Sequence, residues 1–263
     1  MHRTVAGLFV AGWLLAAPAW ACSYSVAFYE LGLLYYRDAQ GVAQGIDKDV
    51  IDALSQRSGC RFEPVLESRV RIWKQLAEGQ LDLSVSGIAN PERERFAEFI
   101  PYFQTRNMLL LRRGVPNQAR SPEGFKATPE LRVAVVKSFK HGTFYDTWLA
   151  SLREQGGRVV EAADFDTVLR LFKAGRADAF LALPTSWLLA ARQQGLAEAV
   201  DLLDWAPEER VVHGLIVSRL RVPEADRQRL REAMASLLAD GTVATLLRRQ
   251  VGADVARTLQ LTD

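Results

Sequence analysis

The chain has 263 residues, of which 49% are hydrophobic, 24% charged and 9% aromatic. This composition excludes a disordered chain, a collagen-like fibre and a disulfide-dense miniprotein, and the length suits one large domain or two of ordinary size. Lysine and arginine number 33 against 31 aspartate and glutamate residues, a formal net charge of +2, and no basic block with interleaved aromatics appears. The composition therefore gives no support to nucleic acid as a partner.

The first 21 residues have the pattern of a secretory signal peptide. His2 and Arg3 precede an apolar stretch over 5–17, and an Ala-Trp-Ala triplet ends at Ala21. A short positive region, an apolar core and small residues before the cut are typical of a cleavable signal. The stretch is shorter than a membrane-spanning helix of about 20 residues. We therefore expect export to the periplasm and a mature chain that begins near Cys22.

The two cysteines of the chain are Cys22 and Cys60, and the first allows two interpretations. A cysteine at the cleavage point can carry a lipid, although the bulky Trp20 makes a poor lipoprotein signal. Alternatively, it forms a structural disulfide with Cys60 in an oxidising compartment. Strand patterns follow both cysteines, at 24–28 and 61–65. Parallel pairing of these strands would bring both sulfurs to the same end of one sheet, which favours the disulfide.

From residue 24 onward, short apolar strands alternate with amphipathic helices, as is typical of an α/β fold. We expect the first helix to have Asp49 as its N-cap and to end at Gly59. A second helix should end at Gly79, and its apolar positions are Val70, Trp73, Leu76 and Ala77. Further elements are expected at 81–85, 132–137, 143–155, 158–161, 166–174, 177–182, 186–194, 224–240 and 242–250.

A faint internal repeat links 76–83 to 172–179. Both segments contain a helix end, a glycine, a two-residue gap, an aspartate and a new strand. Any joint between a helix and a strand favours glycine and aspartate, so one interpretation is purely local. The alternative interpretation is that two lobes share one plan.

The chain also shows where one lobe would give way to another. Segments 108–111 and 213–218 have the pattern of two strands that cross between lobes. We therefore expect a first lobe built from 22–108 and 215–263, a second lobe built from 109–214, and a cleft between them.

Several motifs, in this order, resemble the periplasmic solute-binding proteins of polar amino-acid ABC transporters, the third bacterial extracellular family. The resemblance covers about residues 24 to 250. It rests on Gly45–Val50, Trp73–Asp82, Ser86–Arg93, Phe99–Phe103, Gly175–Ala179 and Ala239–Thr242. It implies the two-lobed periplasmic-binding-protein fold of type II, with lobes that are joined by crossing strands and close on a ligand.

In this family an arginine forms a bidentate pair with the carboxylate of the ligand, and Arg93 stands at that position. A guanidinium matches a carboxylate in both shape and charge. The alternative is that Arg93 pairs with neighbouring glutamates on a solvated helix. The resemblance also implies contacts from Ser86, Gly87 and Ile88, where backbone amides after a strand bind carboxylates. The segment from Gly87 to Arg93 is one residue shorter than is usual in the family. The hydroxyl that usually contacts the ligand nearby is either replaced by Ala89 or missing.

The second half departs further from the family pattern. The aspartate that binds the α-ammonium is replaced by Leu183, so the amine is held elsewhere or the ligand has none. Ser138, His141 and Thr143 fall in the expected anion-binding turn, although the histidine also suits a local capping role.

The loop after the first strand supplies further candidates. Glu30 could replace the missing aspartate or be a solvated loop residue. The aromatic ligand contact of the family falls at Leu34, so Tyr29 or Tyr36 could substitute for it. Trp73 is expected in the helix core rather than against the ligand.

The leading hypothesis is a monomeric periplasmic protein that binds a small solute and delivers it to an ABC transporter permease or a membrane sensor. The alternatives are an enzyme on the same scaffold, similar to the cyclohexadienyl dehydratases, and a stand-alone sensory module. An enzyme would need a cleft acid beside the leaving group, for which Glu30 and His141 are candidates. No cofactor is expected, and the three histidines of the chain are too scattered to indicate a metal site.

Overall fold

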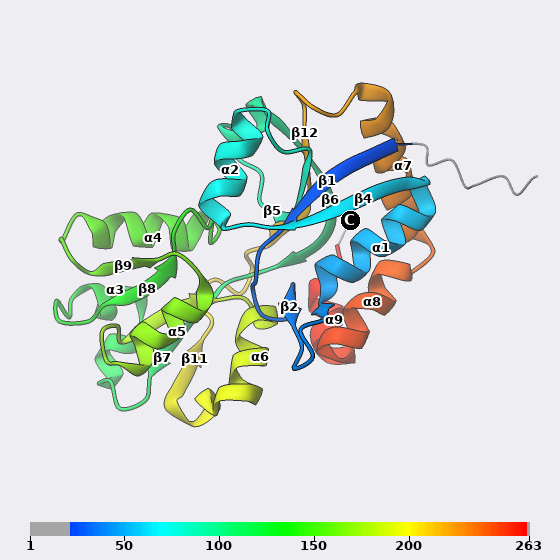
Figure 1. The fold of residues 1–263 in the computed structure, drawn as a ribbon. Coiled ribbons are helices and arrows are strands. Elements are labelled where there is room, and N and C mark those ends of the chain that lie inside the picture. The colour runs from blue at the N-terminus through cyan, green and yellow to red at the C-terminus, as the bar shows by residue number, and fades with distance from the viewer. Residues whose placement is uncertain (1–21, 262–263) are drawn as a thin grey trace, which may run out of the picture.

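The computed structural model describes residues 22–261, so the predicted signal peptide lies outside the described residues. Figure 1 shows two lobes, each built around a five-stranded sheet. The first sheet has the strand order β4-β1-β5-β12-β6. Its strands are β1 Cys22–Phe28, β4 Cys60–Leu66, β5 Leu83–Gly87, β6 Ala97–Thr105 and β12 Val211–Ser218. The predicted α/β, two-lobed fold is confirmed.

Helices cover both faces of the first sheet. They are α1 Ile46–Ser58, α2 Arg69–Ala77, α7 Glu224–Ala239, α8 Thr242–Val251 and α9 Ala253–Leu259. The parallel order β4-β1-β5, joined by right-handed crossovers, places α1 and α2 on opposite faces, as Figure 1 shows. A small hairpin of β2 Tyr36–Arg37 and β3 Ala43–Gln44 lies beside the sheet.

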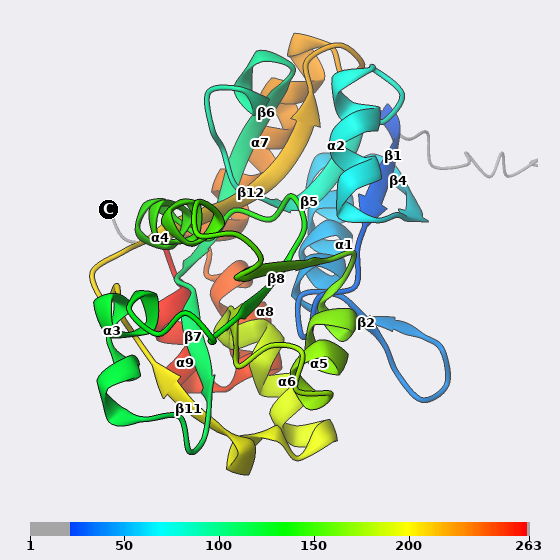
Figure 2. The ribbon, with the colours of Figure 1, turned by 90° about the vertical axis from the view of Figure 1, so that its left-hand side faces the viewer.

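The second sheet has the order β11-β7-β10-β8-β9. Its strands are β7 Met108–Arg112, β8 Val133–Val136, β9 Val159–Ala162, β10 Ala179–Ala182 and β11 Val200–Leu203. Its helices are α3 Pro122–Lys126, α4 Thr143–Arg153, α5 Phe165–Lys173 and α6 Pro184–Gln194. Figure 2, turned by 90°, shows this lobe toward the viewer, with the first sheet above and behind it.

The two lobes share one plan, which supports the second interpretation of the internal repeat. The units β1-α1-β4-α2-β5 and β8-α4-β9-α5-β10 have the same order of elements and the same strand neighbours. Both repeats turn at a left-handed glycine, Gly79 or Gly175. Asp82 and Asp178 then each accept a hydrogen bond from a backbone N–H beside the neighbouring strand.

The chain passes between the sheets twice, once between β6 and β7 and once between β11 and β12. The strand Met108–Arg112 lies wholly in the second sheet, and Val211–Ser218 pairs with β6 in the first. The prediction that these two strands cross is therefore wrong, because short links outside the sheets make both passages. Arg106 and Asp204, one from each link, form an ion pair with 2.8 Å between Nε and Oδ2.

The disulfide prediction is confirmed. Cys22 and Cys60 are bonded, with their Cα atoms 4.5 Å apart. They are also register partners in the parallel pairing of β1 and β4, so the bond closes one end of the sheet.

Two local predictions need correction. The first helix begins at Ile46, after Gly45, and not at Asp49, because Gly45 takes the positive φ of 125° that the entry turn requires. It ends as expected at Gly59 in the left-handed conformation. The buried positions of α2 are Arg69, Ile72 and Leu76, whereas Val70 and Ala77 are exposed. The face of α2 that packs on the sheet is therefore rotated about the helix axis relative to the predicted face, and the two share only Leu76 among their buried residues.

Candidate functional site

The two lobes meet along a cleft that holds two cavities. The first, of about 580 Å³, is lined by the loop after β1, the start of α2, and helices α5 and α6 of the second lobe. The second, of about 630 Å³, lies between α2 and α4. Val136 and Phe139 of the second lobe line both cavities. The turn at Phe139 therefore separates two halves of one interlobe cleft.

Backbone contacts also join the lobes beside the first cavity. The Leu33 amide donates to the Thr185 carbonyl across the cleft, with 2.8 Å between N and O. Gly32 has φ +53°, and a Cβ there would lie 2.3 Å from the Cα of Ser186. Only glycine allows this approach, because any side chain would meet backbone.

Arg93 lies between the lobes in a short 3₁₀ turn, Arg93–Arg95, and is only 7% exposed. Its Nη1 donates to the Ile88 carbonyl and its Nη2 to the Ser138 carbonyl of the second lobe, both at 2.9 Å. The guanidinium carbon lies 3.7 Å from the centre of the Trp73 ring. Burial, reinforced by the charge of Arg69, lowers the pKa of Arg93 to about 10, so the side chain stays charged at neutral pH. The alternative interpretation, an ion pair between Arg93 and a neighbouring glutamate, is not observed among the described residues.

Arg69, the first residue of α2, is a second buried cation that the sequence interpretation missed. It is 2% exposed and lines the first cavity. Its Nη atoms lie 3.4 Å from the Val85 carbonyl and 3.2 Å from the Ser86 carbonyl, and its Nε–H makes no hydrogen bond. One signal could have revealed it, because Arg69, Ile72 and Leu76 follow the spacing of a single helix face. An arginine in line with apolar residues indicates a buried charge.

A polar cluster lies under the end of β5. Asp47 is fully buried, and its carboxyl accepts hydrogen bonds from the Ser86 hydroxyl at 2.8 Å and the Tyr102 hydroxyl at 2.7 Å. Burial raises the pKa of Asp47 to about 7, although the two hydroxyls and the nearby Arg69 oppose the shift. His213 lies 3.2 Å from the Ser86 carbonyl through Nδ1, and burial lowers its pKa to about 3, so it is neutral.

The segment at the end of β5, where contacts with a carboxylate were expected, bonds and packs mainly within the protein. Ser86 has φ +49°, and its amide donates to the Tyr102 hydroxyl, so its amide and hydroxyl both bond within the protein. Gly87 packs so tightly that a Cβ would lie 2.2 Å from Ile216. Ile88 presents its carbonyl to Arg93. Ala89 is exposed.

In the second lobe, Ser138 has φ +63° and directs its carbonyl to Arg93. His141 is 4% exposed, and its backbone amide donates to Asp146. Thr143 is exposed at the start of α4, where the next amide donates to Glu209 at 2.9 Å. Carboxylates of the protein therefore already occupy one amide of the expected anion-binding turn, that of His141, and the amide of Phe144 directly after it.

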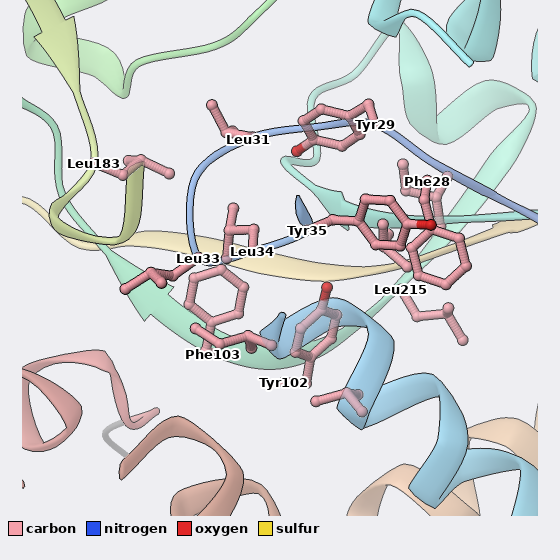
Figure 3. Packing of buried hydrophobic residues seen from close by; sticks show 14 of the residues in the cluster. Phe28, Tyr29, Leu31, Leu33, Leu34, Tyr35, Tyr102, Phe103, Leu183 and Leu215 are labelled. Atoms are coloured by element: carbon pink, nitrogen blue, oxygen red, sulfur yellow. The ribbon is translucent and has the colours of Figure 1, made fainter. Parts of the chain in front are cut away.

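The loop after β1 places its candidates around the first cavity. Tyr29, Glu30 and Tyr36 all line it; Tyr29 is buried and Glu30 is exposed at the rim. The Tyr29 ring lies 4.2 Å from the guanidinium carbon of Arg69, and burial raises the pKa of Tyr29 to about 12. Leu183 is 1% exposed and lies beside the loop that carries Leu31 and Leu33, as Figure 3 shows.

None of the helices among residues 22–261 has the length and the apolar composition that crossing a membrane requires. Nor does the same range contain a group of three or more histidine, cysteine, aspartate or glutamate side chains placed to hold a metal ion.

The fold is shared with several solved structures. An ancestral arginine-binding protein bound to arginine has a TM-score of 0.73 at 19% identity, over 88% of this chain and 98% of that one. The arginine-, lysine-, histidine-binding protein ArtJ from Geobacillus stearothermophilus has a TM-score of 0.72 at 16% identity, over 88% and 95%. An ancestral amino acid-binding protein, described as a precursor of cyclohexadienyl dehydratase, has a TM-score of 0.70 at 19% identity, over 87% and 95%.

The TM-scores establish the shared fold, whereas sequence identities this low do not identify the ligand. A comparison with curated protein sequences gives no match. The family model of the bacterial extracellular solute-binding proteins, family 3, matches residues 32–253, which include both lobes and the cleft. The chain therefore belongs to the bacterial extracellular solute-binding proteins, family 3.

Proposed function

We propose that this protein is a periplasmic, monomeric solute-binding protein. It captures a small carboxylate-bearing solute, an amino acid or a related compound, by closure of its lobes and delivers it to an ABC transporter. The observation that carries the proposal is Arg93, a buried guanidinium between the lobes that has no carboxylate partner among the described residues. Burying an uncompensated charge costs free energy, so the site favours an anion.

Arg93 also supports the proposed closure. Its Nη2 already reaches the second lobe through the Ser138 carbonyl. A ligand carboxylate would replace this neutral acceptor by a charged one, and hydrogen bonds between charged groups are stronger. A ligand that contacts both lobes binds the closed form more tightly than the open one and therefore shifts the population towards closure.

Binding without chemistry is favoured over a dehydratase-like reaction because the two candidate acids are poorly suited. Glu30 is exposed at the cavity rim. Burial lowers the pKa of His141, which disfavours the charged imidazolium that would serve as the acid.

The test is a ligand screen with the protein purified from the periplasm of an expression host. Amino acids and simple carboxylates would be screened by thermal shift, and each hit measured by calorimetry. A ligand at 100 times its Kd should stabilise the protein by about 2.7 kcal/mol. Arg93→Ala should abolish the hit, whereas Arg95→Ala, an exposed neighbour, should preserve it. Mass spectrometry should recover the ligand unchanged; an altered product, or no carboxylate bound at all, would contradict the proposal.

A further inference from the structure

The site contains two buried guanidinium groups, whereas the family resemblance accounts for one. Arg69 is 2% exposed and Arg93 is 7% exposed. Their guanidinium carbons lie 5.1 Å and 3.7 Å from the centre of the same Trp73 ring. The charge of Arg69 lowers the pKa of Arg93, which shows that the two cations repel each other. Neither forms an ion pair within the described part of the chain.

The one buried carboxyl nearby does not serve as their partner. Both oxygens of Asp47 accept hydrogen bonds from the hydroxyls of Ser86 and Tyr102. The contacts of Arg69 itself are two long hydrogen bonds to neutral carbonyls. These bonds orient the guanidinium and include no ion pair, and burial of Asp47 opposes the ionisation by which it would offset the charge of Arg69.

Each half of the cleft also has an unpaired donor. The Nε–H of Arg69, at the first cavity, and the Nε1–H of Trp73, at the second, are buried and make no hydrogen bond. Both groups can only donate, so each requires an acceptor. A buried donor without an acceptor is costly, and an acidic group in each half would supply one.

The two cations face different halves of the cleft. Arg69 lines the first cavity and Arg93 the second, with Phe139 of the second lobe lining both. A single acidic group at Arg93 would therefore leave the Arg69 side uncompensated. Two acidic groups, one toward each cavity, match this arrangement.

The first cavity holds no buried carboxylate for an ammonium group. Among its lining residues, Arg69 is the only charged side chain that is buried. The carboxylates Glu30, Asp164 and Asp166 lie at the exposed rim, and the half-buried Glu67 pairs with Arg71. In the second cavity, the half-buried Asp146 accepts a hydrogen bond from the His141 amide. Leu183, at the position where the resemblance implies an aspartate, is buried and apolar.

We infer that the ligand is a dianion, a small dicarboxylate without an ammonium group, whose second acidic group is bound by Arg69. This inference rests on the proposed function and specifies its substrate class. A hydrogen bond between charged groups raises the affinity for the ligand roughly 10- to 100-fold. Dicarboxylates should therefore bind at least about 10-fold more tightly than otherwise identical monoanions.

The experiment compares matched ligands by calorimetry on the wild-type protein. The probes are dicarboxylates from malonate to adipate, the monomethyl ester of each, and the amino derivatives aspartate and glutamate. The best dicarboxylate should bind at least about 10-fold more tightly than its own monoester and than its amino derivative. Equal affinity for the monoester, or tighter binding of the amino derivative, would overturn the inference and leave the proposed function intact. Failure of every carboxylate would overturn the proposed function as well.

Variants then locate the second acidic group. Arg69→Gln should remove the preference for the dicarboxylate and preserve the weaker binding of the monoester. Arg95→Gln removes the same charge at an exposed position and should leave both affinities unchanged. An equal loss of affinity for both ligands in Arg69→Gln would indicate that Arg69 only supports the end of β5. If that variant does not fold, Arg69→Lys and the wild-type comparison still decide the question.

Discussion

The buried carboxyl of Asp47 should make the stability of the protein depend on pH in an unusual direction. In the folded chain, burial raises its pKa from 3.8 to about 7, and the hydrogen bonds from Tyr102 and Ser86 and the charge of Arg69 offset only part of this effect. In the unfolded chain the same carboxyl ionises near its ordinary value. The perturbation is Asp47→Asn, which keeps the shape of the side chain and removes its ionisation.

The sign follows from which state binds the proton. Between pH 4 and pH 7 the folded protein keeps the proton on Asp47 and the unfolded chain loses it, so the free energy of unfolding falls as the pH rises. The fall is about 1.4 kcal/mol per pH unit and ends near pH 7, above which both states are ionised. Over the whole window the loss from this one group is roughly 4 kcal/mol. The variant escapes this loss, so it should gain stability relative to the wild type as the pH rises.

The assay is urea unfolding of both proteins at intervals from pH 4.5 to pH 8.5. The difference between variant and wild type cancels the groups that titrate in both. Asp52→Asn, on the exposed face of the same helix, is the control and should show no such slope. A difference that is independent of pH, or that falls with rising pH, would refute the reasoning. It would mean that Asp47 is ionised in the fold, where it would also offset the charge of Arg69.

Two further predictions concern the disulfide and the contact between the lobes. Replacing Cys22 and Cys60 together by serine opens a loop of 38 residues and should lower the free energy of unfolding by about 2–4 kcal/mol, as measured by urea unfolding. Dithiothreitol should destabilise the wild type similarly and leave the double variant unaffected; equal stability of the two proteins would contradict this. Gly32→Ala should hold the lobes apart, because its Cβ would meet Ser186 at 2.3 Å. Small-angle scattering should then show a larger radius of gyration, and calorimetry should show weaker ligand binding. Gly41 also has a positive φ, but a Cβ there would meet no other atom, so Gly41→Ala should change neither quantity.

Much of the fold could be predicted because it depends on local chemistry. The strand patterns after Cys22 and Cys60 and the glycine stop at Gly59 are properties of a few neighbouring residues. The α2 face was harder to predict, because Val70 and Ile72 are both apolar and only the packing direction decides which is buried. Residues 253–259, which form α9, were not predicted as a helix, although Gly252 with φ 83° separates them from α8.

The site was less predictable than the fold. Arg93 could be selected as a ligand anchor from the motif around it, and it does lie buried in the cleft. Its contact with Ser138 could not be predicted, because it joins residues 45 positions apart in different lobes. Thr143 was expected in an anion-binding turn by spacing; its side chain is exposed, and the Glu209 carboxylate accepts a hydrogen bond from the next amide.

The sequence by itself determined the alternation of strands and helices and the resemblance to the family, and it favoured the disulfide over a lipid anchor at Cys22. These features follow from periodicity, from residues with special backbone freedom and from motifs a few residues long. Tertiary structure alone decided that Arg69 is buried beside Arg93 and that no carboxylate among residues 22–261 forms an ion pair with either one. The reason is that charge compensation depends on distances between segments far apart in the chain, and those distances exist only once the lobes have folded and met.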